Sequence, residues 1–272
     1  MDKFNKIYAN GCSFSCAGGL QWDYTKELYK EKLSITIDNH MDLAYPTLIS
    51  NHYNVPIEND AISGGSINRL VRKTYEYIYK NISDVKNTLF ILEIPPMWRD
   101  ELWSNKLDRT LNVTSGLISH PDTDLTDISN GYSKHEFKKI YNEIMIYFDS
   151  FVNPDFEDNK AFNSVLGLIS FIKILNINYI ILDNSHFHHY LVKHGMTKKD
   201  FNFCFFENVE MSKWFNFRKL TINDELGMHI DGHAGIKGNK LISEIVINHI
   251  NNTILNKNNL NSPYENLPIK LF

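Results

Sequence analysis

Near its start the chain reads KIYANGCSFSCAGG over residues 6–19, which places two serines and two cysteines within five residues. An apolar run that ends in Asn-Gly is typical of a strand that turns into a loop. A serine at such a turn can expose its hydroxyl at the edge of a sheet, where the following backbone N–H groups can bind an oxyanion. Ser13 is therefore a candidate nucleophile, and a helix-capping serine is the alternative interpretation.

Two later segments carry groups that a serine nucleophile needs. Residues 59–66, NDAISGGS, place two glycines where the backbone can approach an oxyanion closely. Near the other end, HIDGHAGIKG sets Asp231 and His233 just before an expected helix. A base must hydrogen-bond the serine, and a carboxylate must orient the imidazole. Ser13, His233 and Asp231 therefore form a candidate catalytic set.

The elements that must position these groups alternate between strand and helix. Short apolar runs of strand length occur at residues 6–11, 55–61, 87–94 and 177–185, and helical spacing occurs at residues 41–53, 66–82, 159–176 and 237–251. Ser66 is a candidate N-cap of the second helix. This alternation predicts a parallel sheet covered on both faces, with ligands bound beyond the carboxyl ends of its strands. The candidate residues all follow such ends or precede a helix.

Residues 98–135 are polar and rich in turn formers, and they interrupt the alternation. Loops of this length are usually functional or disordered. We expect an insertion over the carboxyl edge of the sheet, followed by an extra helix over residues 135–151. Trp98, Trp103 and Tyr132 are candidates for stacking on a sugar, and anchoring of the loop is their alternative role. The expected organisation is one domain over residues 1–250, with the insertion at approximately 98–156, and an Asn-rich tail over 251–272.

In this order the segments resemble the SGNH (GDSL-like) hydrolase superfamily. The matches are Gly11-Cys12-Ser13 to the nucleophile block, Asn59 and Gly64 to the second block, and Asp231, His233 and Gly238 to the last block. The extended form GCSFS looks like the variant common in bacterial and phage members. The resemblance implies a flavodoxin-like three-layer α/β/α sandwich with a central parallel sheet and, here, an insertion after the third strand.

The resemblance also implies an esterase-like reaction without a cofactor or metal. Ser13 would attack an ester carbonyl, His233 would take its proton, and the backbone amides of Ser13 and Gly64 would form the oxyanion hole. A small acyl ester is the implied substrate, and O-acetylated carbohydrates are frequent substrates in the superfamily. Asn68, Trp98, Arg99 and Trp103 are the candidate substrate-binding residues.

The chain departs from the family pattern at three places. Cys12 stands where the family usually has an Asp. The stretch LEIPPMWRDE lacks the Asn that normally supplies an oxyanion donor, a role that backbone amides, Arg99 or Asn68 could take. Asp231 lies two residues before His233 instead of three, which leaves Asp224 or a backbone carbonyl as alternative partners of the imidazole.

These departures keep a second class of function open. A non-catalytic SGNH-type domain that binds glycans, or that serves in structure or assembly, for example in a phage, would also carry an altered site. A thiol function of Cys12 and Cys16 is another alternative, because a helix start would lower a thiol pKa. A further alternative is a metal site in the histidine-rich stretch SHFHHYLVKH, which offers His186, His188, His189 and His194 and could be completed by Asp183, although no fixed-spacing motif supports it.

Composition excludes several partners. The 28 basic and 32 acidic residues give a formal net charge of −4 without a basic stripe, so we expect no nucleic-acid partner. No run approaches the roughly 20 apolar residues of a membrane span. The first ten residues lack the apolar core of a signal peptide, and three cysteines fit a reducing compartment. We therefore expect a cytoplasmic protein, or a virion-associated one if the chain is of phage origin; no feature specifies an oligomeric state.

Overall fold

The structure is a computed structural model. It describes residues 4–20, 40–95, 99–105, 109–113, 154–183, 193–196, 203–204 and 234–255, with single positions at 143, 144, 146, 147, 150 and 191. Its strands are β1 Lys6–Asn10, β2 Ile57–Asn59, β3 Thr88–Ile94, β4 Asp100–Ser104, β5 Arg109–Val113, β6 Asn178–Asp183 and β7 Phe203–Cys204. Its α-helices are α2 Tyr45–Tyr53, α3 Ile67–Lys80, α6 Pro154–Ile174 and α9 Ile236–Ile250, and short 3-10 helices lie at Gly18–Leu20, His40–Leu43 and Val85–Asn87.

The central sheet has the order β2-β1-β3-β6-β7, and the pairings described in it are all parallel. Counted within this sheet alone, the order is 2-1-3-4-5, which is the flavodoxin-like arrangement. The predicted fold class is therefore confirmed. The four predicted strands correspond to β1, β2, β3 and β6, whereas β7, which pairs through Phe203 and Cys204 alone, was not predicted.

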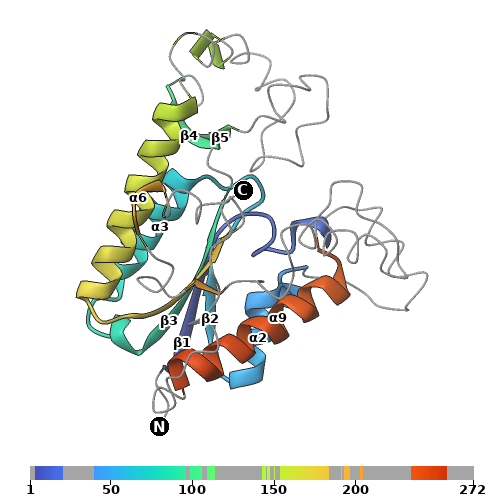
Figure 1. The fold of residues 1–272 in the computed structure, drawn as a ribbon. Helices are drawn as coiled ribbons and strands as arrows, with labels where there is room; N and C mark the ends of the chain where they lie inside the picture. Colours follow the sequence, from blue (N-terminus) through green and yellow to red (C-terminus); the bar gives the residue numbers. More distant parts are fainter. Residues whose placement is uncertain are drawn as a thin grey trace, which may run out of the picture.

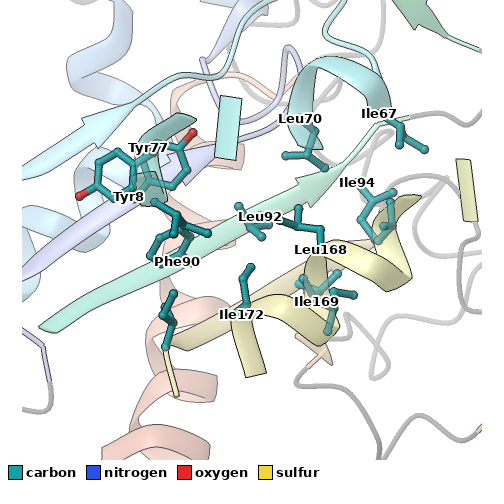
Figure 2. Close-up of a cluster of buried hydrophobic side chains, with 14 of the residues drawn as sticks. Tyr8, Ile67, Leu70, Tyr77, Phe90, Leu92, Ile94, Leu168, Ile169 and Ile172 are labelled. Carbon is teal, nitrogen blue, oxygen red and sulfur yellow. The ribbon is translucent and has the colours of Figure 1, made fainter. Parts of the chain in front are cut away.

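One face of the sheet is covered by α3 and α6 (Figure 1). Between the sheet and these two helices lies a cluster of buried apolar side chains (Figure 2). It contains alternate residues of β3, namely Phe90, Leu92 and Ile94, together with Leu168 and Ile169 of α6. On β1, Tyr8 stacks on Tyr77 of α3 with ring centroids 4.0 Å apart. Full burial of a side chain of this size contributes about 1.5–3 kcal/mol, so this layer holds the sheet in place.

The other face is covered by α2 and α9 (Figure 1). The intervening residues of β3, Leu89 and Ile91, are buried there with Ile49 of α2 and with Val246 and Ile250 of α9. Strand β3 is thus buried on both faces, which explains why its sequence is a continuous apolar run instead of an alternating one. Beyond α9 the chain continues as a π-helix at Asn251–Leu255, and Ile254 joins the same cluster.

Helix α3 begins as its sequence predicts. The hydroxyl of Ser66 accepts a hydrogen bond from the backbone N–H of Arg69 at 3.2 Å, so Ser66 is the N-cap. Apolar residues at helical spacing, including Leu70 and Tyr77, face the sheet. The other face carries the ion pairs of Arg72 with Glu76 and Glu101.

The insertion follows the third strand, as predicted, and contains an unpredicted antiparallel hairpin of β4 and β5. The guanidinium of Arg72 donates to both carboxylate oxygens of Glu101, at 3.0 and 2.7 Å. The side-chain amide of Asn68 donates to the carboxylate of Asp100. Strand β4 is therefore fixed to α3 by polar contacts. In the part of the chain that the structure describes, no helix is long and apolar enough to cross a membrane.

Candidate active site

Ser13 lies in a compact turn at the carboxyl end of β1. Its carbonyl oxygen accepts a hydrogen bond from the N–H of Gly18 at 2.6 Å, and the N–H of Cys16 donates to the carbonyl of Cys12 at 3.3 Å. Ala17 completes the turn with a φ of 52°, which is uncommon for a residue with a β-carbon. Only 3% of the surface of Ser13 is exposed. The predicted strand-to-loop turn is confirmed, and it is tightly packed.

The loop after β2 packs directly against this turn. A β-carbon on Gly65 would lie 2.6 Å from the carbonyl oxygen of Gly11, so the two backbones meet without room for a side chain. The preceding residue, Gly64, has a φ of 75°, which favours glycine. The side-chain amide of Asn59 donates to the carbonyl of Ser15 at 2.8 Å. The first two motif segments are therefore in contact.

The end of β1 is anchored by the buried side chain of Asn10. Its amide nitrogen donates to the Tyr8 hydroxyl at 3.2 Å, to the Leu70 carbonyl at 3.1 Å and to Thr74 Oγ1 at 3.2 Å. Its amide oxygen accepts the N–H of Gly11 at 2.9 Å. Asn10 thus ties the first residue of the turn to α3. This role was not predicted from the sequence, where a polar residue at the end of an apolar strand is the available signal.

A second missed residue is Glu93 in β3, which is 3% exposed. Its Oε2 accepts hydrogen bonds from the N–H groups of Cys12 and Ser15, at 3.3 and 2.9 Å, and from the Ser15 hydroxyl at 2.5 Å. Its Oε1 accepts from the thiol of Cys12 at 3.0 Å. The available signal was a lone acidic residue within the apolar run TLFILEI.

Cys12 and Cys16 are buried thiols. Burial, the largest cause, together with the neighbouring Glu93, raises the pKa of Cys12 to about 12. Burial likewise raises the pKa of Cys16 to about 12. The expectation that a helix start lowers these thiol pKa values is wrong, because desolvation of the thiolate outweighs it. Cys12 is a small buried residue at the position where the family pattern usually has an Asp.

Two of the candidate substrate-binding residues are described in full. The positive charge of Arg99 partly opposes the rise in the pKa of Cys12 that burial and Glu93 cause. Asn68 lies on α3, where it bonds Asp100 of the hairpin. Trp103 lies in β4 opposite Thr110, and only its backbone is described. Outside the described residues lie Trp98, Tyr132, His186, His188, His189, Asp224, Asp231 and His233.

The chain becomes described again at Ala234, the residue after His233. Ala234 is buried in the same cluster as Cys12 and Phe14. The side chain of Asn239, in the first turns of α9, donates to the carbonyls of Ala234 and Gly235 at 3.1 and 3.0 Å. The start of α9 is therefore held on the side of the sheet where the Ser13 turn lies.

Among the residues that the structure describes, no group of three or more His, Cys, Asp or Glu side chains is placed to hold a metal ion, and His186, His188 and His189 lie outside those residues. His194, the described member of the histidine-rich stretch, stacks on Phe162 with ring centroids 4.8 Å apart.

Solved structures similar to this chain are esterases and acylhydrolases. The psychrotrophic esterase EstA from Pseudoalteromonas sp. is 12% identical, with a TM-score of 0.49, over 93% of this chain and 100% of that one. A putative lipolytic protein of the G-D-S-L family from Desulfitobacterium hafniense is 9% identical, with a TM-score of 0.41, over 90% and 99%. An acetyl xylan esterase from Butyrivibrio proteoclasticus is 10% identical, with a TM-score of 0.40, over 92% and 64%. No protein-family model and no curated protein sequence matches the chain.

Proposed function

We propose that this chain is a serine hydrolase of acyl esters of the SGNH (GDSL-like) type. Ser13 is the nucleophile, His233 is the general base, and Asp231 orients the imidazole. The backbone N–H groups of Ser13 and Gly64 form the oxyanion hole. Arg99 is the candidate for the donor role that the family assigns to an Asn absent here.

The contact between the two motif loops carries this proposal. Gly65 lies against Gly11 and Cys12 without space for a β-carbon, and Asn59 holds the carbonyl of Ser15. Strands β1 and β2 are adjacent and parallel, so both loops leave the same edge of the sheet. This is the edge at which open parallel sheets bind ligands. A chain of hydrogen bonds from Ser15 through Tyr45 and Asn239 reaches the carbonyl of Ala234, the residue after His233, and this link supports His233 as the base.

The proposed reaction proceeds in two steps. Ser13 Oγ attacks the ester carbonyl while its proton passes to His233, and the oxyanion that forms is stabilised by the two backbone N–H groups. When the C–O bond to the alcohol breaks, His233 returns the proton to the departing oxygen. Water then attacks the acyl-serine with His233 again as base, which releases the carboxylic acid and restores Ser13.

For the substrate we propose a small acyl ester, with an O-acetylated carbohydrate as the preferred class. Trp98 precedes β4 in the sequence and Trp103 belongs to β4, and a tryptophan offers the large flat surface on which a sugar can stack. Because α3 fixes β4 through Asn68 and Arg72, the hairpin is a firm support for such a surface.

The test compares wild type, Ser13→Ala and His233→Ala in the hydrolysis of p-nitrophenyl acetate and butyrate. Ser170→Ala and His52→Ala are matched controls, since both residues are exposed on helices away from the turn. An alkyl fluorophosphonate should phosphonylate Ser13 with loss of fluoride, and mass spectrometry identifies the modified peptide. Turnover and labelling that both variants lose and both controls keep support the proposal. Turnover that survives in Ser13→Ala contradicts it.

One observation favours the non-catalytic alternative, a binding or assembly domain of the same type. With 3% of its surface exposed, Ser13 meets an ester only after neighbouring groups move. A wild-type protein that gives neither turnover nor labelling would support this alternative. Acetylated and unacetylated xylan then serve as the binding probes in isothermal titration calorimetry.

A further inference from the structure

Glu93 projects a buried carboxylate from the sheet into the turn that holds Ser13. In the parallel register Asn10 of β1 lies opposite Leu92 of β3, so Glu93 stands one residue beyond the last paired position, beside Gly11. A β-carbon on Gly11 would lie 2.6 Å from Glu93 Cβ and 2.9 Å from Glu93 Oε2. The carboxylate therefore occupies the space that a side chain at residue 11 would need.

The contacts of this carboxylate surround Ser13. The two backbone N–H groups that donate hydrogen bonds to it belong to Cys12, the residue before Ser13, and to Ser15, two residues after Ser13. Together with the Ser15 hydroxyl and the Cys12 thiol, these four groups are all donors, which suits an ionised carboxylate. A turn held from both sides of the nucleophile has little freedom to move its hydroxyl.

The network extends from Glu93 toward the last helix. Since the Ser15 hydroxyl donates its one proton to Glu93, the Tyr45 hydroxyl, 2.6 Å away, must be the donor to Ser15 Oγ. The backbone N–H of Tyr45 donates to Asn239 Oδ1 at 3.0 Å. Asn239 holds the carbonyls of residues 234 and 235. A chain of buried hydrogen bonds thus links the Ser13 turn to the start of α9.

We infer that Glu93 is a positioning residue, which sets the Ser13 turn and, through Ser15, Tyr45 and Asn239, fixes that turn relative to the chain segment that begins α9. This inference rests on the proposed function, because the segment follows His233 directly in the chain. A small displacement between nucleophile and base slows a reaction strongly, since about 1 Å can cost roughly a hundredfold. The expected loss therefore falls on the chemical step and leaves ester binding nearly unchanged.

The test uses Glu93→Gln, which keeps the size of the side chain and one acceptor oxygen but removes the charge. We expect kcat to fall by about tenfold to a hundredfold with KM changed by less than about twofold. In Glu93→Ala, which also loses the acceptor oxygen, kcat should be lower still, so that glutamine at this position restores part of the activity that alanine loses. Glu58→Gln is the control: it removes a carboxylate charge that pairs with Lys6 at the start of β1, at the opposite end of that strand from the turn. The control should keep kcat.

A structural readout keeps the inference separate from the proposed function. Hydrogen–deuterium exchange of peptides covering residues 11–17 should accelerate in Glu93→Gln and Glu93→Ala and stay unchanged in Glu58→Gln. Unchanged exchange in both Glu93 variants overturns the inference whether or not the protein is an enzyme. Faster exchange without any loss of kcat, or of the labelling rate of Ser13, overturns the positioning role. A wild type that is neither active nor labelled refutes the proposed function, and with it the catalytic part of the inference, while faster exchange would still support the role of Glu93 in the turn.

Discussion

The N–H of Gly18 donates to the carbonyl of Ser13 at 2.6 Å, and a β-carbon on Gly18 would lie 2.8 Å from Cβ of Ser13. The same β-carbon would lie 2.6 Å from the hydroxyl of Ser63, in the loop after β2. Gly18 therefore closes the turn that holds Ser13, and its lack of a side chain lets this turn and the loop after β2 approach each other. The packing of the site depends on the absence of a side chain at this position.

Gly18→Ala should consequently disturb the turn. We expect a loss of about 1–3 kcal/mol in the free energy of unfolding, because Ser13 and Ser63 must shift to admit a methyl group. Ester hydrolysis by the proposed enzyme should fall at least about tenfold. Urea unfolding and steady-state kinetics measure the two effects.

Gly167→Ala is the matched control for that change. A β-carbon on Gly167 meets nothing within 4 Å, and the residue lies inside α6. Alanine there should raise the free energy of unfolding by about 0.5–1 kcal/mol and leave activity unchanged. If Gly18→Ala behaves like Gly167→Ala, the close approach of Gly18 to Ser13 does not matter to the site.

The insertion hairpin should loosen when its ion pair with α3 is removed. Arg72 bonds both carboxylate oxygens of Glu101, so Arg72→Ala leaves a nearly buried carboxylate without this partner. We expect opening of β4 and β5 to become easier by about 1 kcal/mol, seen as roughly fivefold faster amide exchange over residues 100–113. Lys73→Ala is the control, because Lys73 pairs with Glu76 on its own helix. Equal exchange in both variants would contradict the role of the ion pair.

The sequence predicts those parts of the fold that local patterns encode. Strands β1, β3 and β6 are continuous apolar runs because helices cover both faces of the sheet, and the cap at Ser66 is a local interaction over three residues. Strand β7 has two residues, Phe203 and Cys204, in an apolar run too short to distinguish a strand from other structure, so its pairing with β6 decides its existence. The hairpin lies in a polar stretch whose register depends on docking to α3.

In the candidate site, too, some residues can be found from local sequence and others only from contacts between distant segments. Ser13 and Gly64 are found from short motifs because each motif describes one turn. Glu93 reaches backbone donors 78 and 81 residues away in the sequence. No local pattern encodes that meeting, since it arises from the parallel register of β1 and β3. The raised thiol pKa values are equally non-local, because they depend on how deeply the folded chain buries the turn.

Cys12 and Cys16 should resist alkylation in the folded protein. With pKa values of about 12, caused mainly by burial, both remain thiols at pH 8, whereas in the unfolded chain a thiol titrates near pH 8.5. Iodoacetamide followed by peptide mapping should leave both residues unmodified in buffer and modify both in urea. Modification of Cys12 in buffer at the rate seen in urea would contradict its burial.

The same shifts give stability a defined pH dependence. Between about pH 9 and pH 12 the unfolded chain loses thiol protons that the folded chain keeps, so the free energy of unfolding must fall as pH rises through this window. The double variant Cys12→Ala, Cys16→Ala should show a shallower decline over the same range. The quantity to compare is the slope of the unfolding free energy against pH, because the cavities that alanine creates lower the stability itself at every pH. An identical slope in wild type and variant would show that these thiols do not contribute.

In the acidic range, stability should depend on the protonation of His249 on α9, because burial lowers the pKa of this side chain to about 4. Below about pH 6.5 the unfolded chain binds a proton that the folded chain does not, so stability is lost as pH falls toward 4, on the order of 2 kcal/mol from this residue. His249→Gln removes the titration and should flatten the decline of the unfolding free energy between pH 7 and pH 4.5. His52→Gln, at an exposed position on α2, is the control and should keep the wild-type slope. A decline in His249→Gln as steep as in wild type would mean that protonation of another group dominates acid unfolding.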